Sequence, residues 1–463
     1  MNNLSLPKTL LALLACTLAA GGCATHRTAS PGPTAAPAPP TADAVLAAIP
    51  APGSVTLTDK AIAKWTGKAR ANPADDKAWV NLGDALMQKP RETADYHYYG
   101  YAEQAYTQAL AHNPGSADAL TGMAWVTSDR HQFDKSVEWA NKAIALEPRN
   151  NTAYGLIGDA NVELGQYNDA YAAYQKMLDI RPDASSYSRG AHLLYLTGNP
   201  RKATWLMAKA IKTGAPYAEN TTWCSTQLAL MLFNEGALLP ADQILQDALK
   251  GTPNNYRALA AMGMVQAAKK NYPAAIADYK KSLAVAPEIT SLAALGDLYA
   301  VTGDKAEAER QYALLEELHK RNTDISVHDH MQMAQFYADH DRNLVQAMQF
   351  AEEHKLTKNV NEADTLAWCY YKNGLQAQAK AAITTALAWH TPDARIYFHA
   401  GMIYAKDGDR VTGGKYLAEA LSLNPNFSPI FARTAADTLA QLGSHPPTAQ
   451  ASARLPSAQS YGP

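Results

Sequence analysis

Residues 151–182 read NTAYGLIGDANVELGQYNDAYAAYQKMLDIRP, and this stretch decides the fold of the chain. In its first half, Tyr154, Ile157, Gly158 and Asn161 follow one another at spacings of three and four residues. Such spacing places side chains on one face of a helix. The first half of the stretch therefore predicts an amphipathic helix.

The second half of the stretch predicts another helix, joined to the first by a tight turn. Gly165 can take the left-handed conformation that ends a helix, and Ala170, Tyr174 and Met177 then follow at helical spacing. Pro182 closes the unit, because proline cannot continue a helix but suits the first turn of the next one. Neither helix can bury its apolar stripe alone, so each pair must stack on neighbouring pairs.

The same unit recurs along the chain at a nearly fixed period. Similar stretches end at Pro114, Pro148, Pro182 and Pro216, which are 34 residues apart. A fixed period of this length is typical of stacked helical repeats. The period therefore predicts a solenoid that grows by adding units, without separate globular domains.

The pattern resembles the tetratricopeptide repeat (TPR), which reads W-x2-L-G-x2-Y, then A-x3-F, then a closing proline. One unit of this chain opens with WVNLG at residues 79–83 and continues with Ala102 and Tyr106. Comparable matches cover roughly residues 74–425 and indicate about ten units. The resemblance implies an all-α, right-handed superhelix with a concave face that binds extended peptides.

Composition divides the chain into four segments. Residues 1–23 resemble an export signal, with Lys8 ahead of a short apolar run. Residues 24–58 are rich in Ala, Pro and Thr, which predicts a disordered linker. Residues 59–443 hold the repeats between an N-terminal helix and a C-terminal capping helix, and residues 444–463 predict a disordered tail.

The end of the export signal, Ala19-Ala-Gly-Gly-Cys23, resembles a bacterial lipobox. The resemblance implies that Cys23 becomes the lipidated first residue, which would tether the protein to a membrane. Because Ala20 stands where leucine is usual, plain cleavage, lipidation at Cys16 and an uncleaved signal remain alternatives. Ala24 follows the cysteine, and a residue other than aspartate there is typical of lipoproteins that reach the outer membrane. We therefore expect a periplasmic protein anchored in the outer membrane.

Charge and cysteine usage argue against a nucleic-acid partner and a disulfide framework. The 463 residues include 41 Lys and Arg against 43 Asp and Glu, so the basic surplus of a nucleic-acid-binding protein is missing. Beyond the export segment, Cys224 and Cys369 lie about four repeats apart. That separation is too large for a disulfide bond, and we expect both to be small, semi-buried apolar side chains.

The sequence holds no convincing catalytic motif. It contains no P-loop, GxSxG, HExxH or CxxC, and no span outside the repeats is long enough for a catalytic domain. We therefore expect no enzyme activity, no cofactor and no bound metal. The nearest alternative is a zinc site made by His319, His328, His330 and His354 with neighbouring carboxylates. Because His328 and His330 do not share a helix face, exposed histidines on a divergent repeat are the simpler interpretation.

The concave groove is the predicted binding surface. In the register of the repeat, the inward positions of the first helix of each unit are mostly aromatic: Trp125, His192, Tyr195, Trp223, Phe233, Trp368, Tyr371 and Phe398. Such side chains can anchor protein partners or stack on sugar rings, although each can equally serve inter-repeat contacts. The Lys and Asn residues with which some TPR domains clamp a terminal carboxylate are missing, since Gly155 and Asp159 stand there in unit three.

Unit one carries an insert of about seven residues around positions 91–100, where Tyr96, Tyr98 and Tyr99 cluster. It predicts either a longer turn packed on the next unit or a contact surface. Taken together, these features predict a non-catalytic scaffold in the cell envelope that binds envelope proteins along its groove.

The alternative is a periplasmic TPR subunit of a polysaccharide secretion or outer-membrane assembly system, which binds glycan or the export machinery. A glycan groove would present acidic groups beside aromatic ones along several units. Acidic residues at inward positions keep this alternative open: Asp84, Asp159, Asp297 and Asp364.

Overall fold

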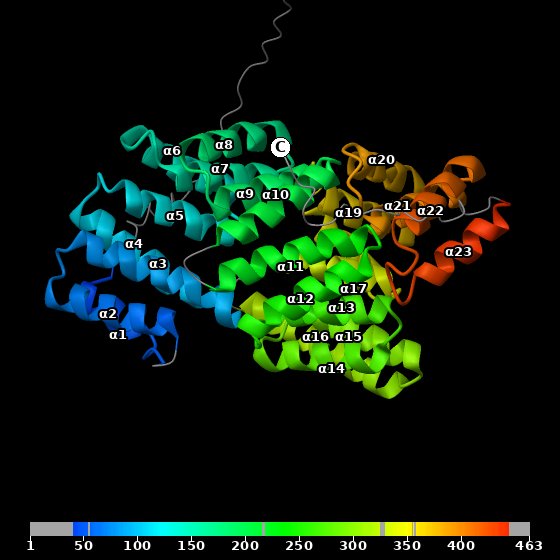
Figure 1. Cartoon of the computed structure of the whole chain (residues 1–463), viewed down its shortest axis with the longest axis horizontal. Helices are drawn as coiled ribbons and strands as arrows, with labels where there is room; N and C mark the ends of the chain where they lie inside the picture. Colours follow the sequence, from blue (N-terminus) through cyan, green and yellow to red (C-terminus); the bar gives the residue numbers. More distant parts are fainter. Residues whose placement is uncertain are drawn as a thin grey trace, which may run out of the picture. The chain divides into compact units, whose positions relative to one another are not determined.

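The computed structural model describes residues 40–53, 56–214, 218–324, 329–353, 355 and 358–443. Within these ranges the secondary structure is entirely helical, with 23 helices and no strand (Figure 1). None of the described helices combines the length and apolar character needed to cross a membrane. The predicted export signal, the lipid-attachment residue Cys23 and the tail at 444–463 lie outside the described residues.

Ten helix pairs form the body of the described chain, and each corresponds to one repeat unit. Helices α1 (Ala42–Ala48) and α2 (Leu57–Ala71) precede the pairs, and α23 (Ala432–Gln441) follows them. The pairs are α3 (Asp76–Thr93) with α4 (Tyr98–His112), α5 (Ala117–Asp129) with α6 (Phe133–Leu146), α7 (Asn151–Glu163) with α8 (Tyr167–Ile180), α9 (Ala184–Leu196) with α10 (Pro200–Thr213), α11 (Ala218–Asn234) with α12 (Leu238–Gly251), α13 (Tyr256–Ala268) with α14 (Tyr272–Val285), α15 (Ile289–Thr302) with α16 (Lys305–Asp324), α17 (His330–Asp339) with α18 (Leu344–Glu352), α19 (Val360–Lys372) with α20 (Gln376–Leu387), and α21 (Ala394–Lys406) with α22 (Arg410–Leu423). The all-α solenoid predicted from the repeat period is confirmed.

Unit three shows why the sequence folds into such pairs. Helix α7 begins after Asn150, whose side chain accepts a hydrogen bond from the backbone N–H of Ala153. The chain turns at Gly165, which has φ +69°. In the returning helix α8, the ring of Tyr174 lies against Gly158, where a Cβ atom would be 2.1 Å from Cε1 of the ring. Glycine at this position therefore allows the two helices to approach closely.

The same contact between a glycine and an aromatic ring recurs in other units. A Cβ atom on the glycine would be less than 3.0 Å from the ring in each of these pairs: Gly83 with Tyr106, Gly263 with Tyr279, and Gly296 with Tyr312. The rings themselves are buried. The apolar stripe that one pair cannot cover alone thus becomes part of a core that continues through the stack.

The sequence predicts a disordered linker over residues 24–58, but residues 42–48 form helix α1; residues 24–39 lie outside the described residues. Although the composition there is rich in Ala and Pro, Val45 and Leu46 are buried against unit one. Gln108 of α4 donates from Nε2 to the carbonyl oxygen of Pro40 at 2.6 Å. Burial of a few apolar side chains is enough to order this segment, because the first repeat offers an uncovered apolar face.

Units far apart in the sequence also meet, through the connections that follow α18, α20 and α22. Turn glycines of units three to five, among them Gly165 and Gly236, lie against the backbone of these connections. One side chain from each connection donates to a carbonyl oxygen near the end of α7, α9 or α11: Asn359 Nδ2 to Val162 at 3.3 Å, Thr391 Oγ1 to Leu196 at 2.5 Å, and Asn424 Nδ2 to Phe233 at 2.8 Å. We call these three hydrogen bonds the inter-turn clasp, because they join successive turns of the solenoid.

Candidate functional site

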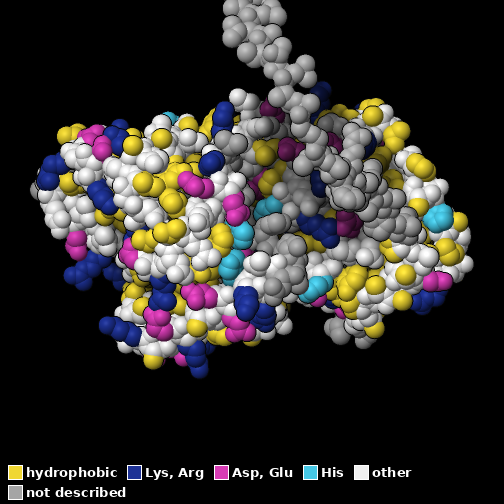
Figure 2. All heavy atoms as spheres, turned by 180° about the vertical axis from the view of Figure 1, so that it is seen from behind, with side chains coloured by type: hydrophobic (Ala, Val, Ile, Leu, Met, Phe, Trp, Pro, Cys, Tyr) yellow, Lys and Arg dark blue, Asp and Glu magenta, His cyan; other side chains and the backbone are white. Residues whose placement is uncertain are grey.

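A cavity of about 1020 Å³ lies between units one to three and units six to eight. One wall comes from the α3–α4 connection, the α5–α6 turn and the end of α7. The other comes from the start of α13, the α14–α15 connection, α16 and the start of α17. On the face drawn in Figure 2, histidine, basic and acidic side chains gather around a central hollow, while hydrophobic side chains are scattered. The cavity therefore unites residues from distant parts of the chain.

The insert of unit one forms part of the cavity wall. It lengthens α3 to 18 residues, after which Ala94 takes a left-handed conformation with φ 54°. The short connection to α4 places Tyr96 and Tyr99 on the cavity, with their ring centroids 5.8 Å apart. Arg91 fixes the insert to α11, since its Nε is 3.1 Å from Oε2 of Glu219. The insert, for which the sequence left two interpretations open, is thus a longer helix whose end faces the cavity.

The cavity lining carries more acidic than basic side chains. Besides two histidines it includes five carboxylates and two guanidinium groups: Asp129, Asp159, Glu163, Glu288 and Asp329 against Arg130 and Arg257. A cleft in which one sign of charge is in excess raises the local concentration of ligands of the opposite sign.

Several of these charges are neutralised within the protein. Two form ion pairs, Asp159 with Arg189 and Arg130 with Glu103, and Oδ1 of Asp329 lies 2.6 Å from Nδ1 of His319. Arg257 lies over the ring of Tyr256, with 4.7 Å between Cζ and the ring centroid. These groups stabilise the walls and leave little charge for a ligand.

Asp129 and Glu288 differ from the other carboxylates. Within the described part of the chain, neither forms an ion pair at 4.0 Å or less. Burial raises the pKa of Asp129 to about 6, helped by the charge of Asp159 and opposed by Arg91 and by a hydrogen bond from Tyr99. Burial also raises the pKa of Glu288, and the positive charge of Arg257 opposes this effect. Both carboxylates would be stabilised by a bound cation.

Four of the aromatic residues predicted to line the groove are buried instead. Their exposed fractions are small: 7% for Tyr195, 4% for Phe233, 2% for Trp368 and 1% for Phe398. Tyr195 donates to the carbonyl oxygen of Pro392 at 2.7 Å, which lies on the next turn. Trp368 donates from Nε1 to Asp339 at 2.9 Å. Neighbouring turns and helices cover these four side chains in the described structure, so their contact with a partner stays a prediction.

The other four predicted groove residues are half-buried, and their contact with a partner stays a prediction: Trp125, His192, Trp223 and Tyr371. None of them lines the cavity. The ring of Tyr371, for example, stacks on Trp368 with 4.8 Å between centroids. Turns, connections and helix ends line most of the cavity, and the repeat register does not predict which of these come together. The one available signal was the unusual length of unit one.

The acidic positions that kept a glycan interpretation open have partners inside the protein. Three accept a hydrogen bond from a tyrosine hydroxyl of the same unit: Asp84 from Tyr106 at 2.7 Å, Asp159 from Tyr174 at 2.7 Å, and Asp297 from Tyr312 at 2.8 Å. The fourth, Asp364, is 2.9 Å from Nδ1 of His399. These carboxylates satisfy buried polar groups, so their spacing does not by itself indicate a sugar site.

The histidines considered for a zinc site are engaged in pairs. His330 Nδ1 is 2.7 Å from Oε2 of Glu353, and His319 pairs with an aspartate as described above. His328 and His354 lie outside the described residues. In the described ranges, no group of three or more His, Cys, Asp or Glu side chains is placed to hold a metal ion.

Cys224 and Cys369 are buried free thiols, as the sequence predicted. Burial raises the pKa of Cys224 to about 11, so its reactive thiolate is scarce at neutral pH.

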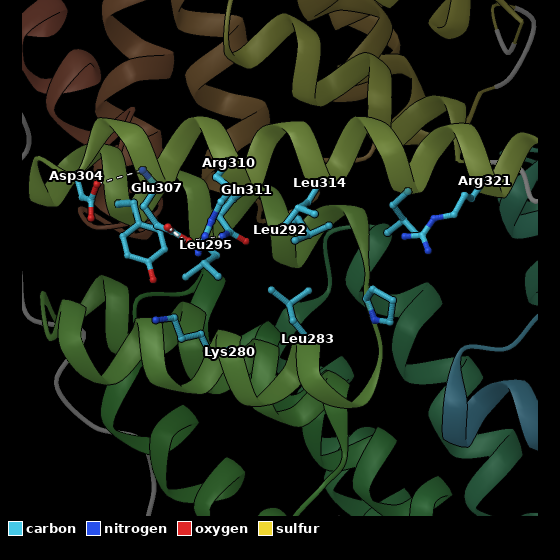
Figure 3. Close-up of a pocket in the computed structure, with 13 residues that line it drawn as sticks. Lys280, Leu283, Leu292, Leu295, Asp304, Glu307, Arg310, Gln311, Leu314 and Arg321 are labelled. Atoms are coloured by element: carbon cyan, nitrogen blue, oxygen red, sulfur yellow. Dashed lines mark hydrogen bonds and ion pairs between the residues drawn. The ribbon is translucent and has the colours of Figure 1, made fainter.

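A second hollow, of about 610 Å³, lies between α14 and α16 with α15 as its floor (Figure 3). Figure 3 shows Lys280 on α14 and Arg310 on α16 at its edges, with leucines between them. Glu307 already pairs with Arg310 at 2.9 Å. The mixed lining gives this hollow no clear chemical preference.

Comparison with known families identifies the repeats. Residues 121–185 and residues 394–427 match models of the tetratricopeptide repeat. The first match lies in units two to four and the second in unit ten. Within these two ranges the chain is therefore similar to the tetratricopeptide repeat, as its sequence resemblance implied.

The individual relatives share only part of the chain. It is 32% identical over 92 residues to "Small glutamine-rich tetratricopeptide repeat-containing protein 2" of Mycosarcoma maydis, covering 20% of this chain and 26% of the relative. It is 29% identical over 121 residues to "General transcriptional corepressor trfA" of Dictyostelium discoideum, covering 26% and 8%. A solved structure, "PilW, widely conserved type IV pilus biogenesis factor", is 16% identical with a TM-score of 0.38, covering 43% of this chain and 92% of that chain. The chain spans about a third or less of the length of these curated relatives.

Proposed function

We propose that this protein is a non-catalytic scaffold of the cell envelope that holds an extended polypeptide segment of a partner protein in the cavity described above. The observation that carries the proposal is a half-open cavity of about 1020 Å³ lined by helical repeats. Repeat solenoids use concave inner surfaces of this kind for binding. The insert of unit one supports the same function, because it adds two tyrosine rings to the wall, and aromatic residues are enriched at protein interfaces.

The envelope location rests on the sequence of residues 1–23. We propose export to the periplasm and lipidation at Cys23, with the repeats tethered to the outer membrane. Metabolic labelling with an alkyne fatty acid tests this in cells expressing the wild type, Cys23→Ser or Cys16→Ser. Label should appear in the wild type and in Cys16→Ser but not in Cys23→Ser. A wild-type chain without label would contradict the lipid anchor, and loss of label only in Cys16→Ser would move the attachment site upstream.

A photo-crosslinking amino acid tests the binding site directly in intact cells. It should replace Tyr99 on the cavity and, as a control, Trp205 of α10, which is 39% exposed and does not line the cavity. We expect light-dependent, protease-sensitive adducts at position 99 and not at position 205. The adducts at position 99 should map to a single region of one polypeptide. Adducts at Trp205 alone would show that the partner binds elsewhere.

The glycan alternative gains no support from the acidic positions, which already bond within the protein. The same crosslinking experiment separates the two functions. An adduct at Tyr99 that resists protease but is destroyed by periodate would contradict polypeptide binding and favour a polysaccharide.

A further inference from the structure

We propose that the cavity recognises a polypeptide segment carrying a lysine or arginine side chain, whose positive charge is held by Asp129 and Glu288. This inference rests on the proposed function and names the chemistry of the partner at the same site.

The two carboxylates come from opposite walls of the cavity. Asp129 is the last residue of α5 in unit two, and Glu288 directly precedes α15 in unit seven. Both line the cavity with Tyr96. Burial raises the pKa of the Tyr96 hydroxyl, the negative charges of Glu288, Asp329 and Asp129 add to this effect, and the positive charge of Arg257 opposes it. A side chain that enters beside Tyr96 therefore meets negative charge from two elements of the fold.

Neither carboxylate has an evident part in holding its helix. Glu288 occupies the position before α15, yet its side chain makes no capping hydrogen bond. Asp129 stands at the C-terminal end of α5, where the helix dipole disfavours a negative charge. Both are desolvated without an ion pair in the described structure, which is unfavourable for the empty protein. A cationic ligand would remove this cost.

Tyr96 and Tyr99 provide a surface for the rest of such a side chain. Their rings are 5.8 Å apart, with 32° between their planes, and both line the cavity. Aromatic faces attract the cations of lysine and arginine, and they also pack against the aliphatic stems. The protein uses this contact itself nearby, where Arg257 lies over the ring of Tyr256.

The size and charge of the cavity favour a chain segment over a small cation. Sites that enclose a drug-sized ligand have volumes of roughly 300–1000 Å³, and this cavity, at about 1020 Å³, accommodates several residues. The excess of carboxylates disfavours acidic segments, because like charges brought together repel. A basic, extended segment fits both properties.

Fluorescence anisotropy with the full mature chain tests the inference. The probe is a capped, labelled peptide of alternating glycine and lysine, compared with matched glycine–glutamine and glycine–glutamate peptides. The variant is Asp129→Asn with Glu288→Gln, which keeps side-chain shape and removes both charges. The control is Asp179→Asn with Asp247→Asn, which removes two exposed charges on α8 and α12. Circular dichroism confirms that each variant is folded.

We expect the lysine peptide to bind the wild type and the control within twofold of each other, and the cavity variant at least tenfold more weakly. Binding should weaken as salt is raised, and the other two peptides should not bind. If the double variant unfolds, comparison of the lysine, glutamine and glutamate peptides on the wild-type protein still tests the inference. Equal binding of lysine and glutamine peptides, or full affinity in the cavity variant, would overturn the inference. Displacement of the peptide by spermidine would also overturn the inference, if it occurs at a spermidine concentration no higher than the concentration of lysine side chains in the peptide.

The crosslinking experiment distinguishes this failure from failure of the proposed function. If the crosslinker at position 99 captures a polypeptide segment without lysine or arginine, the scaffold function is supported and the preference for a cationic segment is contradicted. If the Tyr99 position yields no polypeptide, both fall together.

Discussion

At the scale of single residues, a glycine, a tyrosine and an aspartate hold a helix pair together. In unit seven the ring of Tyr312 covers Gly296, and its hydroxyl donates to Asp297 at 2.8 Å. The ring needs the space that glycine leaves, and the buried hydroxyl needs an acceptor beside it. Close approach of the helices and satisfaction of the hydroxyl therefore depend on adjacent residues.

Substitution of Gly296 by alanine should destabilise the protein. The added Cβ atom would be 2.3 Å from Cε1 of Tyr312, so the ring or the helix must move. Overpacking of this kind costs about 1–3 kcal/mol, which should lower the midpoint of thermal unfolding. The control is Gly67→Ala in α2, where no atom lies within 4 Å of the new Cβ. Because alanine favours a helix over glycine by about 1 kcal/mol, that variant should be slightly stabilised. Equal midpoints for the two variants would contradict this account.

The sequence predicted the contact between the glycine and the tyrosine ring, but not the hydrogen bond from the tyrosine to the aspartate. The spacing of Gly158 and Tyr174 is part of the repeat pattern, so their contact follows from the period. The hydrogen bond from Tyr174 to Asp159 does not, because it depends on the rotation of a side chain across two helices. Asp159 was therefore interpreted as a possible glycan contact, although it serves the fold and the cavity wall.

The pair of His340 and Asp297 should make stability depend on pH. Nδ1 of His340 is 2.7 Å from the carbonyl oxygen of Phe336, and Nε2 is 2.7 Å from Oδ1 of Asp297, so both ring nitrogens face acceptors. Burial opposes the charge of the ring, but the hydrogen bond to Asp297 and the charges of Asp297 and Asp339 raise its pKa above 6.5. The protonated ring then stabilises the fold at low pH, and this contribution is lost as pH rises through the raised pKa.

His340→Gln measures this contribution. A hydrogen bond to a charged group contributes about 1.5–3 kcal/mol, so the variant should unfold at a lower temperature than the wild type below pH 6.5. The difference should shrink as pH rises from 6.5 to 9, because the native ring loses its proton. A difference that stays constant across this range would show that the ring acts through its shape alone.

At the scale of elements, helix α1 shows what composition misses. The segment before α2 is rich in Ala and Pro, but Val45 and Leu46 supply enough apolar surface to dock on unit one. Leu46→Ala should cost about 2–5 kcal/mol locally. Hydrogen exchange should then become faster in α1 and α2 but not in α19 to α22, because stability in a solenoid is local. Ala47→Ser, at an exposed position of the same helix, should leave exchange unchanged. Faster exchange throughout the array would contradict local stability.

Most other elements could be predicted from the period. The prolines at the unit boundaries located the helix pairs, and unit eight forms α17 and α18 even though its closing proline is missing. These two helices are short, with 10 and 9 residues. The insert of unit one was visible as extra length, but its path into the cavity was not, because a composition rich in tyrosine does not fix the direction of a connection.

At the scale of the whole array, the inter-turn clasp could not be predicted. Which units meet depends on the pitch of the solenoid, and pitch is the sum of small rotations between successive pairs. The bonded residues are 191 to 197 positions apart, and nothing in either local sequence marks them as partners. This explains why inward aromatic residues such as Tyr195 were predicted to face a ligand, whereas they face another turn.

Asn359→Asp with Asn424→Asp should separate the turns. Each aspartate keeps the oxygen that accepts backbone N–H groups of its own connection, which in the native protein come from Asn361 and Asn426. It loses the amide donor and places a negative charge against a carbonyl oxygen. Both sites are at most 5% exposed, and an unpaired charge there costs about 3–5 kcal/mol.

Small-angle X-ray scattering should show a larger radius of gyration for this double variant than for the wild type. Asn255→Asp is the matched control, because Asn255 caps α13 in the same way but bonds to no other turn among the described residues. Far-ultraviolet circular dichroism should stay unchanged, since each helix pair keeps its own contacts. If the double variant scatters like the control, the turns are held by other contacts, such as the bond from Tyr195 to Pro392. If it expands, the clasp holds successive turns together, and the same variant should change the affinity of the lysine peptide without altering a residue that lines the site.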